Sequence, residues 1–177
     1  MYNLDEQILL FIQEHIRNPI LTRFFVPLTV FGNAGIFLII LGIVLSLIKK
    51  TRRLGVSFLT ALLINFIIND LVIKNIIRRV RPFHTIPGLE ILIKPPKSFS
   101  FPSGHTSSFF ACGTLLFASS KKYGGLLLLI SLMMGFSRMY VGVHYPSDVF
   151  VGMIVGIISG IITIFFYRFL GKKTSKC

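Results

Sequence analysis

The stretch SRMYVGVHYPSD, residues 137–148, places an arginine, a histidine and an aspartate between two long apolar segments. These residues are Arg138, His144 and Asp148. Ionisable side chains beside apolar segments are energetically costly inside a membrane, so they commonly mark a functional site. The stretch therefore predicts a site that handles an anion at a membrane boundary.

The composition on either side of this stretch is that of an integral membrane protein. Of the 177 residues, 53% are hydrophobic and 14% are charged, whereas soluble domains carry about 25% charged residues. The net charge of +13 is also seen in nucleic-acid-binding proteins, but beside such long apolar runs we expect a membrane and no nucleic acid. Basic residues in membrane proteins set the topology and contact anionic lipids. We expect no disulfide or metal ligand from Cys112 and Cys177.

The apolar segments predict an all-α bundle of five to six transmembrane helices. Residues 3–17 have apolar side chains at helical spacing but are too short to cross, because a crossing needs about 20 residues. They predict an amphipathic helix on the membrane surface. A short apolar helix at 20–31 follows Pro19 and is interrupted by Gly32-Asn33, and whether it crosses decides between five and six spans. Spans are expected at about 34–48, 54–80, 103–120, 124–141 and 147–169.

No linker or repeat divides the chain, which predicts a single membrane domain over residues 1–177. Short and interfacial helices occupy 1–31, and the transmembrane core occupies 34–170. Basic clusters at 49–53, 121–122 and 168–176 alternate so that they share one side of the membrane. By the positive-inside rule this side is cytoplasmic and includes the C-terminus. The polar motifs then face outward.

The first outward motif is KNIIRRVRP, residues 74–82. If one helix continues to Pro82, then Lys74, Arg78 and Arg81 line one face of it, with Asp70 one turn below. A basic helix end that extends its side chains into the membrane interface would give the same pattern. The motif alone does not choose between these readings.

The second motif is PSGH, residues 102–105, at the start of an apolar segment. Proline is common in the first turn of a helix, so Ser103, Gly104 and His105 are expected at a helix N-terminus. The free N–H groups there favour an anion, and glycine permits close approach of a ligand. An ordinary helix start with an interfacial histidine is the simpler alternative.

The third motif is the opening stretch itself. A helix beginning near Tyr145-Pro146 would place His144 just before it and Asp148 in its first turn. The aspartate would then fix the tautomer of the histidine and leave the other ring nitrogen free as a nucleophile. Glycines continue the Asp148 face every fourth residue, which predicts close packing against another helix; they are Gly152, Gly156 and Gly160. A purely structural histidine–aspartate pair is the alternative.

Together, Lys74-x6-Arg81-Pro82, Pro102-Ser103-Gly104-His105 and Ser137-Arg138-x5-His144-x3-Asp148 resemble the signature of the type-2 phosphatidic acid phosphatase superfamily. These membrane lipid phosphate phosphatases share their site with vanadium haloperoxidases. The resemblance covers about residues 60–170 and includes all three motifs in order.

The resemblance implies a role for each matched residue. His144 would attack phosphorus to form a phosphohistidine, Asp148 would orient it, and His105 would serve as acid and then base. Substrate phosphate would be bound by the remaining matched residues, which are Lys74, Arg81, Arg138, Ser103 and Gly104. No metal and no cofactor are implied. Arg78, Arg79 and His84 match no family position and are expected as flanking contacts, and no role is assigned to Asp70.

The resemblance also implies a lipid phosphate substrate in a bacterial plasma membrane, with the site facing outward. Undecaprenyl diphosphate is the expected substrate, followed by phosphatidylglycerol phosphate and phosphatidic acid, because the motifs recognise phosphate and not the lipid tail. The proline-rich loop 83–101 is expected at the mouth of the site. The competing classes are a non-catalytic anionic-lipid binder or transporter and a metal or haem protein using His84, His105 and His144. The sequence does not define the oligomeric state.

Overall fold

The computed structural model describes residues 3–31 and 35–174, with side chains up to Phe169. Within these residues the structure is helical, with loops and no strand. The interruption expected at Gly32-Asn33 and the terminal Cys177 lie outside the described residues. The helices are α1 Leu4–Phe11, η1 Ile12–Ile16, α2 Pro19–Phe31, α3 Ile36–Leu47, α4 Arg52–Asn65, η3 Phe66–Ile73, α5 Lys74–Ile77, α6 Pro82–Thr85, α7 Gly104–Ser119, α8 Lys121–Tyr140 and α9 Pro146–Thr174.

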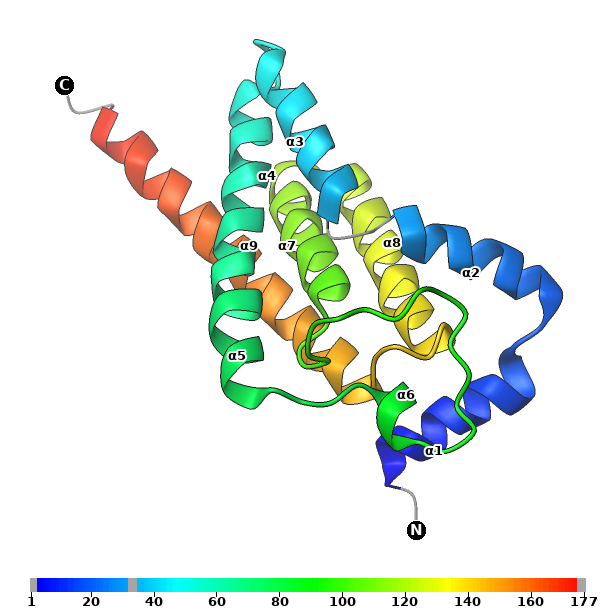
Figure 1. Cartoon of the computed structure of the whole chain (residues 1–177). Helices are drawn as coiled ribbons and strands as arrows, with labels where there is room; N and C mark the ends of the chain where they lie inside the picture. Colours follow the sequence, from blue (N-terminus) through cyan, green and yellow to red (C-terminus); the bar gives the residue numbers. More distant parts are fainter. Residues whose placement is uncertain (1–2, 32–34, 175–177) are drawn as a thin grey trace.

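Helix α7 lies at the centre of the bundle, packed against α4, α8 and α9, while α3 packs outside α4 (Figure 1). The main apolar core is formed where these helices meet, around Leu38, Phe58, Phe109 and Met134. Many large apolar side chains of α3, α4 and α9 face outward. Such an exposed apolar surface is what a membrane protein presents to lipid tails.

The α7–α9 contact depends on the glycines that the sequence predicted to face inward. A Cβ built on Gly156 would lie 2.3 Å from the carbonyl oxygen of Ser107, and one on Gly152 would lie 2.7 Å from that of Ser103. The predicted close packing is therefore confirmed. It brings the start of α7 beside the start of α9, where the Ser103 N–H donates to the Asp148 carbonyl at 3.0 Å.

Two secondary-structure predictions need correction. The helix expected over 54–80 begins at Arg52, contains the π-helical segment η3 and ends at Ile77. Arg78 then adopts a left-handed conformation (φ 49°), so Pro82 begins the short helix α6 and does not terminate the long one. π-helical turns are frequent at functional sites.

Three helical segments among the described residues are long and apolar enough to cross a membrane: Arg52–Thr85, Lys121–Tyr140 and Pro146–Phe169. Helices α2 and α3, taken together as a bent pair, would make a fourth. The expected spans at 34–48 and 103–120 are helical, but α3 has 12 residues and α7 has 16. Both are shorter than the roughly 20 residues of a full crossing.

The connecting segments gather at one end of the bundle. Helices α1 and α6 and the long loop that follows α6 lie at this end, together with the start of α9 (Figure 1). The basic turn between α3 and α4 and the C-terminal end of α9 lie at the opposite end. All three sequence motifs are thus assembled at the first end.

Candidate active site

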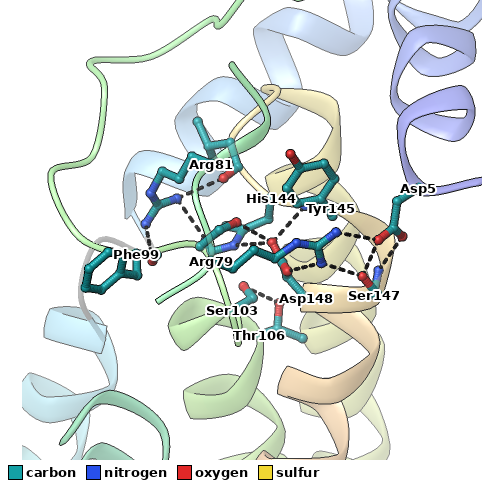
Figure 2. Close-up of polar contacts among 12 residues, drawn as sticks. Asp5, Arg79, Arg81, Phe99, Ser103, Thr106, His144, Tyr145, Ser147 and Asp148 are labelled. Carbon is teal, nitrogen blue, oxygen red and sulfur yellow. Dashed lines mark hydrogen bonds and ion pairs between the residues drawn. The ribbon is translucent and has the colours of Figure 1, made fainter. Parts of the chain in front are cut away.

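His144 and Asp148 form the centre of a buried cluster at this end of the bundle (Figure 2). His144 precedes α9 and Asp148 lies in its first turn, as the sequence predicted. The His144 Nδ1 is 3.4 Å from Asp148 Oδ2, and the two side chains are 2% and 0% exposed. This geometry fits an Nδ1–H that donates to the carboxylate, which leaves Nε2 with a lone pair.

Both carboxylate oxygens of Asp148 accept hydrogen bonds. Oδ2 also accepts from the Tyr145 N–H at 2.9 Å and from the Ser100 hydroxyl. Oδ1 accepts from Arg79 Nη1 at 2.8 Å. Such a fully engaged carboxylate has little freedom to rotate, so it fixes the imidazole beside it.

Burial lowers the pKa of His144 to about 3. The hydrogen bond to Asp148 opposes this change, while the positive charges of Arg81 and Arg138 reinforce it. His144 is therefore a neutral imidazole at physiological pH. A neutral ring is the form that can act as a nucleophile.

Arg81 is buried on the Nε2 side of His144, with its Nη1 3.3 Å from that nitrogen. It also donates to the Val143 carbonyl at 2.8 Å and to the Ser98 carbonyl at 2.7 Å. Further bonds to the Ser98 hydroxyl and the Phe99 carbonyl engage the remaining nitrogen. An anion at this place would have to take the N–H that faces His144, so Arg81 acts chiefly as a fixed positive charge.

Arg138 and His105 have buried nitrogen atoms that lack partners in the described part of the chain. Arg138 Nη1 donates to the Thr29 hydroxyl at 2.5 Å, but its Nε has no hydrogen-bond partner there. The same holds for His105 Nε2. Buried polar atoms are nearly always satisfied, so these two nitrogens indicate a place where a ligand supplies acceptors.

Lys74 and Asp70 face the same site as an ion pair one helical turn apart. Lys74 is buried, which places its charge close to the other cations of the site. Asp70 also approaches the backbone of Gly104, since a Cβ on that glycine would lie 3.5 Å from the carboxylate. The predicted proximity of Lys74 and Asp70 is confirmed.

Ser103 and Gly104 lie at the N-terminus of α7, as predicted. The Ser103 hydroxyl accepts from the Thr106 hydroxyl at 2.9 Å, and Ser103 is fully buried. Gly104 and His105 line a cavity, which is described below. The first N–H groups of α7 have no intrahelical acceptor and therefore suit an anion.

A cavity of about 820 Å³ joins these groups to the apolar surface of the bundle. Its polar end carries Lys74, Arg81, His105, Arg138 and His144. The rest of the lining is largely apolar and comes from helices α2, α3 and α4, from η3 and from the loop after α6. These further lining residues include Val30, Ile39, Leu59, Leu62, Leu63, Phe66, Ile93, Pro95 and Pro96.

The single helical face predicted for Lys74, Arg78 and Arg81 is wrong. Because the helix ends before Arg78, that residue is exposed and its Nε donates to the Asn75 carbonyl at 2.8 Å. Arg81 reaches the cluster from an extended segment (ψ 152°). His84 is exposed and lies against Phe83.

Residues 3–31 and 35–174 contain no group of three His, Cys, Asp or Glu side chains arranged to hold a metal ion.

Several contacts of the cluster were not predicted from the sequence. Arg79 bonds to Asp148 and also to Asp5 of α1, Ser100 bonds to Asp148, and Thr29 accepts from Arg138. These partners are more than forty residues apart along the chain, so no local spacing pattern announces them. The sequence pointed to Arg79 only through its position inside the motif of residues 74–82, where it is an arginine without an assigned role.

The PAP2 superfamily model matches residues 52–173. The chain is 34% identical over 128 residues to the bacitracin transport permease protein BcrC of Bacillus licheniformis, covering 71% of this chain and 63% of that protein. It is 32% identical over 158 residues to the undecaprenyl-diphosphatase BcrC of Bacillus subtilis, covering 86% of this chain and 76% of that protein. The chain thus spans slightly less than two thirds of the first relative.

Two solved structures share the fold. The crystal structure of Aquifex aeolicus LpxE aligns with a TM-score of 0.80 and 30% identity, covering 92% of this chain and 96% of the other. A PAP2-type phosphatidylglycerolphosphate phosphatase from Bacillus subtilis aligns with a TM-score of 0.75 and 26% identity, covering 93% and 84%. With the family model matching most of its length and all three motifs assembled around one cavity, the chain belongs to the PAP2 superfamily.

Proposed function

We propose that this protein is a membrane lipid phosphatase that removes the terminal phosphate of a lipid phosphate or diphosphate. The observation that carries the proposal is the cavity, in which a buried cationic and histidine-rich end meets an apolar wall. The cationic end suits a phosphate, and the apolar wall suits the chain attached to it. A free sugar phosphate or inorganic phosphate would leave that wall without a partner.

The proposed reaction uses the two histidines in sequence. His144 Nε2 attacks phosphorus while the bond to the leaving oxygen breaks, and His105 gives its proton to that oxygen. His105 then takes a proton from water, which attacks the phosphohistidine and releases phosphate. Asp148 holds Nδ1–H of His144 throughout and stabilises the positive charge that develops on the ring.

The transferred phosphoryl group would be bound by the cations of the cluster. Arg138 Nε and His105 Nε2 are the unpartnered nitrogens that its oxygens would satisfy. Lys74 and Arg81 supply charge, and Ser103 and the Gly104 N–H assist at the helix N-terminus. In this arrangement protein cations neutralise the phosphate and no metal or cofactor takes part in the proposed mechanism.

Undecaprenyl diphosphate is the substrate we propose, with undecaprenyl phosphate as the product and a place in cell-wall biogenesis. A Bacillus subtilis relative at 32% identity is named an undecaprenyl-diphosphatase. Phosphatidylglycerol phosphate is the nearest rival, because one aligned structure is a phosphatidylglycerolphosphate phosphatase, and phosphatidic acid follows. A transporter or non-catalytic lipid binder is the candidate from another class, because a second relative is named a transport permease.

We place the protein in the bacterial plasma membrane as one domain over residues 1–177. In this arrangement α1 and η1 lie on the outer surface as an amphipathic interfacial helix, and five to six helical segments cross or enter the bilayer. The site faces outward, and the basic end with the C-terminus is cytoplasmic. The charge asymmetry between the two ends supports this orientation.

Turnover tests the proposal directly. The purified protein should release phosphate from undecaprenyl diphosphate in the presence of EDTA, and His144→Ala should lower the rate by at least about a thousandfold, as loss of a catalytic nucleophile does. Phosphate release is the measurement, and thermal unfolding in detergent shows that the variant is folded. A panel with phosphatidylglycerol phosphate and phosphatidic acid ranks the three substrates by kcat/KM.

Inhibition of phosphate release by vanadate is a second test, because vanadate mimics the geometry of the transition state for phosphoryl transfer. We expect inhibition at or below about millimolar vanadate. Near-normal activity of His144→Ala would show that the mechanism is wrong. Tight lipid binding without phosphate release by the wild-type protein would favour the binder or transporter.

A further inference from the structure

An ion-pair chain connects the N-terminal helix to the centre of the site. Figure 2 shows the guanidinium of Arg79 between two carboxylates. Its Nη1 donates to Asp148 Oδ1 at 2.8 Å, and its Nη2 donates to Asp5 Oδ2 at 2.8 Å. Asp5 comes from α1 and Asp148 from α9, so the two ion pairs of Arg79 connect carboxylates that are 143 residues apart in the sequence.

Arg79 reaches this place because of the helix end that the sequence did not predict. The left-handed conformation of Arg78 reverses the chain after α5, and the Arg79 carbonyl is then held by the Ser100 N–H at 2.9 Å. The guanidinium lies over the ring of Tyr145, 3.7 Å from its centre. Backbone, ring and carboxylates together fix one orientation of the side chain.

Asp5 has a second task at the start of α9. Its Oδ1 accepts from the Ser147 N–H at 3.0 Å, and its Oδ2 accepts from the Ser147 hydroxyl. A carboxylate in this position caps the helix in the same way as a local N-cap residue. Although burial raises the pKa of Asp5, the bonds from Ser147 and Arg79 outweigh it and lower the pKa. Asp5 is therefore ionised at neutral pH.

We propose that Arg79 and Asp5 are positioning residues for the phosphoryl transfer. Arg79 fixes Asp148 through Oδ1, so that Oδ2 stays aligned with the Nδ1–H of His144. Asp5 fixes Arg79 and the first turn of α9 from the N-terminal helix. This inference rests on the proposed function, because it assigns a role in orienting the proposed nucleophile.

The geometry separates these residues from the phosphate-binding cations. The cavity is lined by Lys74, Arg81 and Arg138, whereas both terminal nitrogens of Arg79 are engaged by carboxylates. The side chains of Arg79 and Asp5 are 28% and 20% exposed, whereas that of Asp148 is 0% exposed. Arg79 thus acts through a buried carboxylate, and its loss should change the rate of the chemical step more than substrate binding.

The N-terminal helix is tied to this end of the bundle at further points. Gln13 donates to the Gly88 carbonyl at 2.9 Å and accepts from the Glu90 N–H at 2.8 Å. Arg17 donates to the Tyr140 carbonyl at 2.9 Å. Asp5 therefore lies on an anchored element and can hold Arg79 in place. It also lies outside the segment matched by the family model, which begins at residue 52.

Single-turnover kinetics with enzyme in excess over labelled undecaprenyl diphosphate test the inference. At saturating enzyme the rate constant does not depend on the fraction of folded protein, as long as the folded enzyme remains in excess over the substrate. We expect Arg79→Gln to lower the rate constant roughly ten- to hundredfold and Asp5→Asn roughly three- to tenfold, as expected for losing charge-assisted hydrogen bonds. Steady-state KM should change less than about threefold. Arg79→Lys should recover part of the loss.

The matched controls are an arginine adjacent to Arg79 and a carboxylate on η1, the segment that follows the helix of Asp5. Arg78→Gln removes an exposed arginine beside Arg79, and Glu14→Gln removes an exposed carboxylate from the segment that follows α1. Both should leave the rate constant within about twofold of wild type, since exposed charges contribute little. Unchanged rate constants in Arg79→Gln and Asp5→Asn would overturn the inference.

A measurement independent of turnover separates this inference from the proposed function. The ring nitrogens of His144 can be followed by 15N NMR, and Arg79→Gln should decrease the population of the Nδ1–H tautomer. If wild-type protein shows no turnover with any lipid phosphate, the proposed function fails, and the tautomer alone decides the inference. An unchanged tautomer would then overturn it.

Discussion

At the residue scale, the proposed chemistry depends on the ionisation of His144. A histidine in an unfolded chain takes up a proton near pH 6.5, whereas burial lowers the pKa of His144 to about 3. Between these two pH values the unfolded chain binds more protons than the folded protein. Folding stability therefore falls as the pH is lowered from about 6.5 toward about 3.

We predict that the His144 ring stays neutral from about pH 7.5 to about pH 5. Its ring 15N shifts should be constant over that range, and His144→Gln identifies the signals. A His144 transition near pH 6.5 would contradict the prediction and would mean that the ring is far less shielded from water than its 2% exposure implies.

At the element scale, the packing of α7 against α9 determines how the motif at residues 102–105 is aligned with the motif at residues 137–148. The glycines of α9 admit the α7 backbone, and Ser103 consequently donates to the Asp148 carbonyl. We predict that Gly156→Ala destabilises the protein by about 1–3 kcal/mol, because its Cβ would clash with the Ser107 carbonyl. Thermal unfolding in detergent measures the change.

Gly125→Ala in α8 is the matched control, since a Cβ at Gly125 meets nothing within 4 Å. Alanine is the better helix former by up to about 1 kcal/mol, so this variant should be as stable as wild type or slightly more stable. Equal effects of the two substitutions would show that close α7–α9 packing does not contribute to stability.

At the scale of the whole molecule, the two ends of the bundle differ in kind. One end holds the loops and α1, and the other holds the basic turn of α3–α4 and the end of α9 (Figure 1). The residues of the three motifs that line the cavity belong to the first end. The charge bias predicts that the second end is cytoplasmic. The site would then receive its lipid from the outer leaflet.

Accessibility in intact cells tests this orientation. A cysteine at position 14 (Glu14→Cys, with Cys177→Ser) should react with a membrane-impermeant maleimide, whereas Lys50→Cys in the same background should react only after lysis. Cys112 is buried and should contribute little background. A tag after Cys177 should likewise resist external protease. Labelling of position 50 in intact cells, or cleavage of the tag, would invert the orientation.

The sequence by itself determined the helical membrane class, the family and the local geometry around single motifs. The His144–Asp148 pair was predictable because both residues lie within one turn of a helix start. The inward face of the α9 glycines followed from their four-residue spacing. The start of α7 was expected at this place from Pro102, but Pro102 precedes the N-cap Ser103 and lies outside the first turn of the helix. In each case the decisive interaction is local, so spacing along the chain is equivalent to proximity in space.

The tertiary structure alone decided where the first long helix ends and which distant residues reach Asp148. Arg78 adopts a left-handed conformation where helical periodicity continues, and the segment beyond it is held at the site by the bonds of Arg79 to Ser100 and of Arg81 to Val143. Asp5, Thr29 and Ser100 contact the site across large sequence separations, which no periodic pattern encodes. The sequence thus specified the residues proposed to carry the chemistry, and the fold selected the distant partners that contact them.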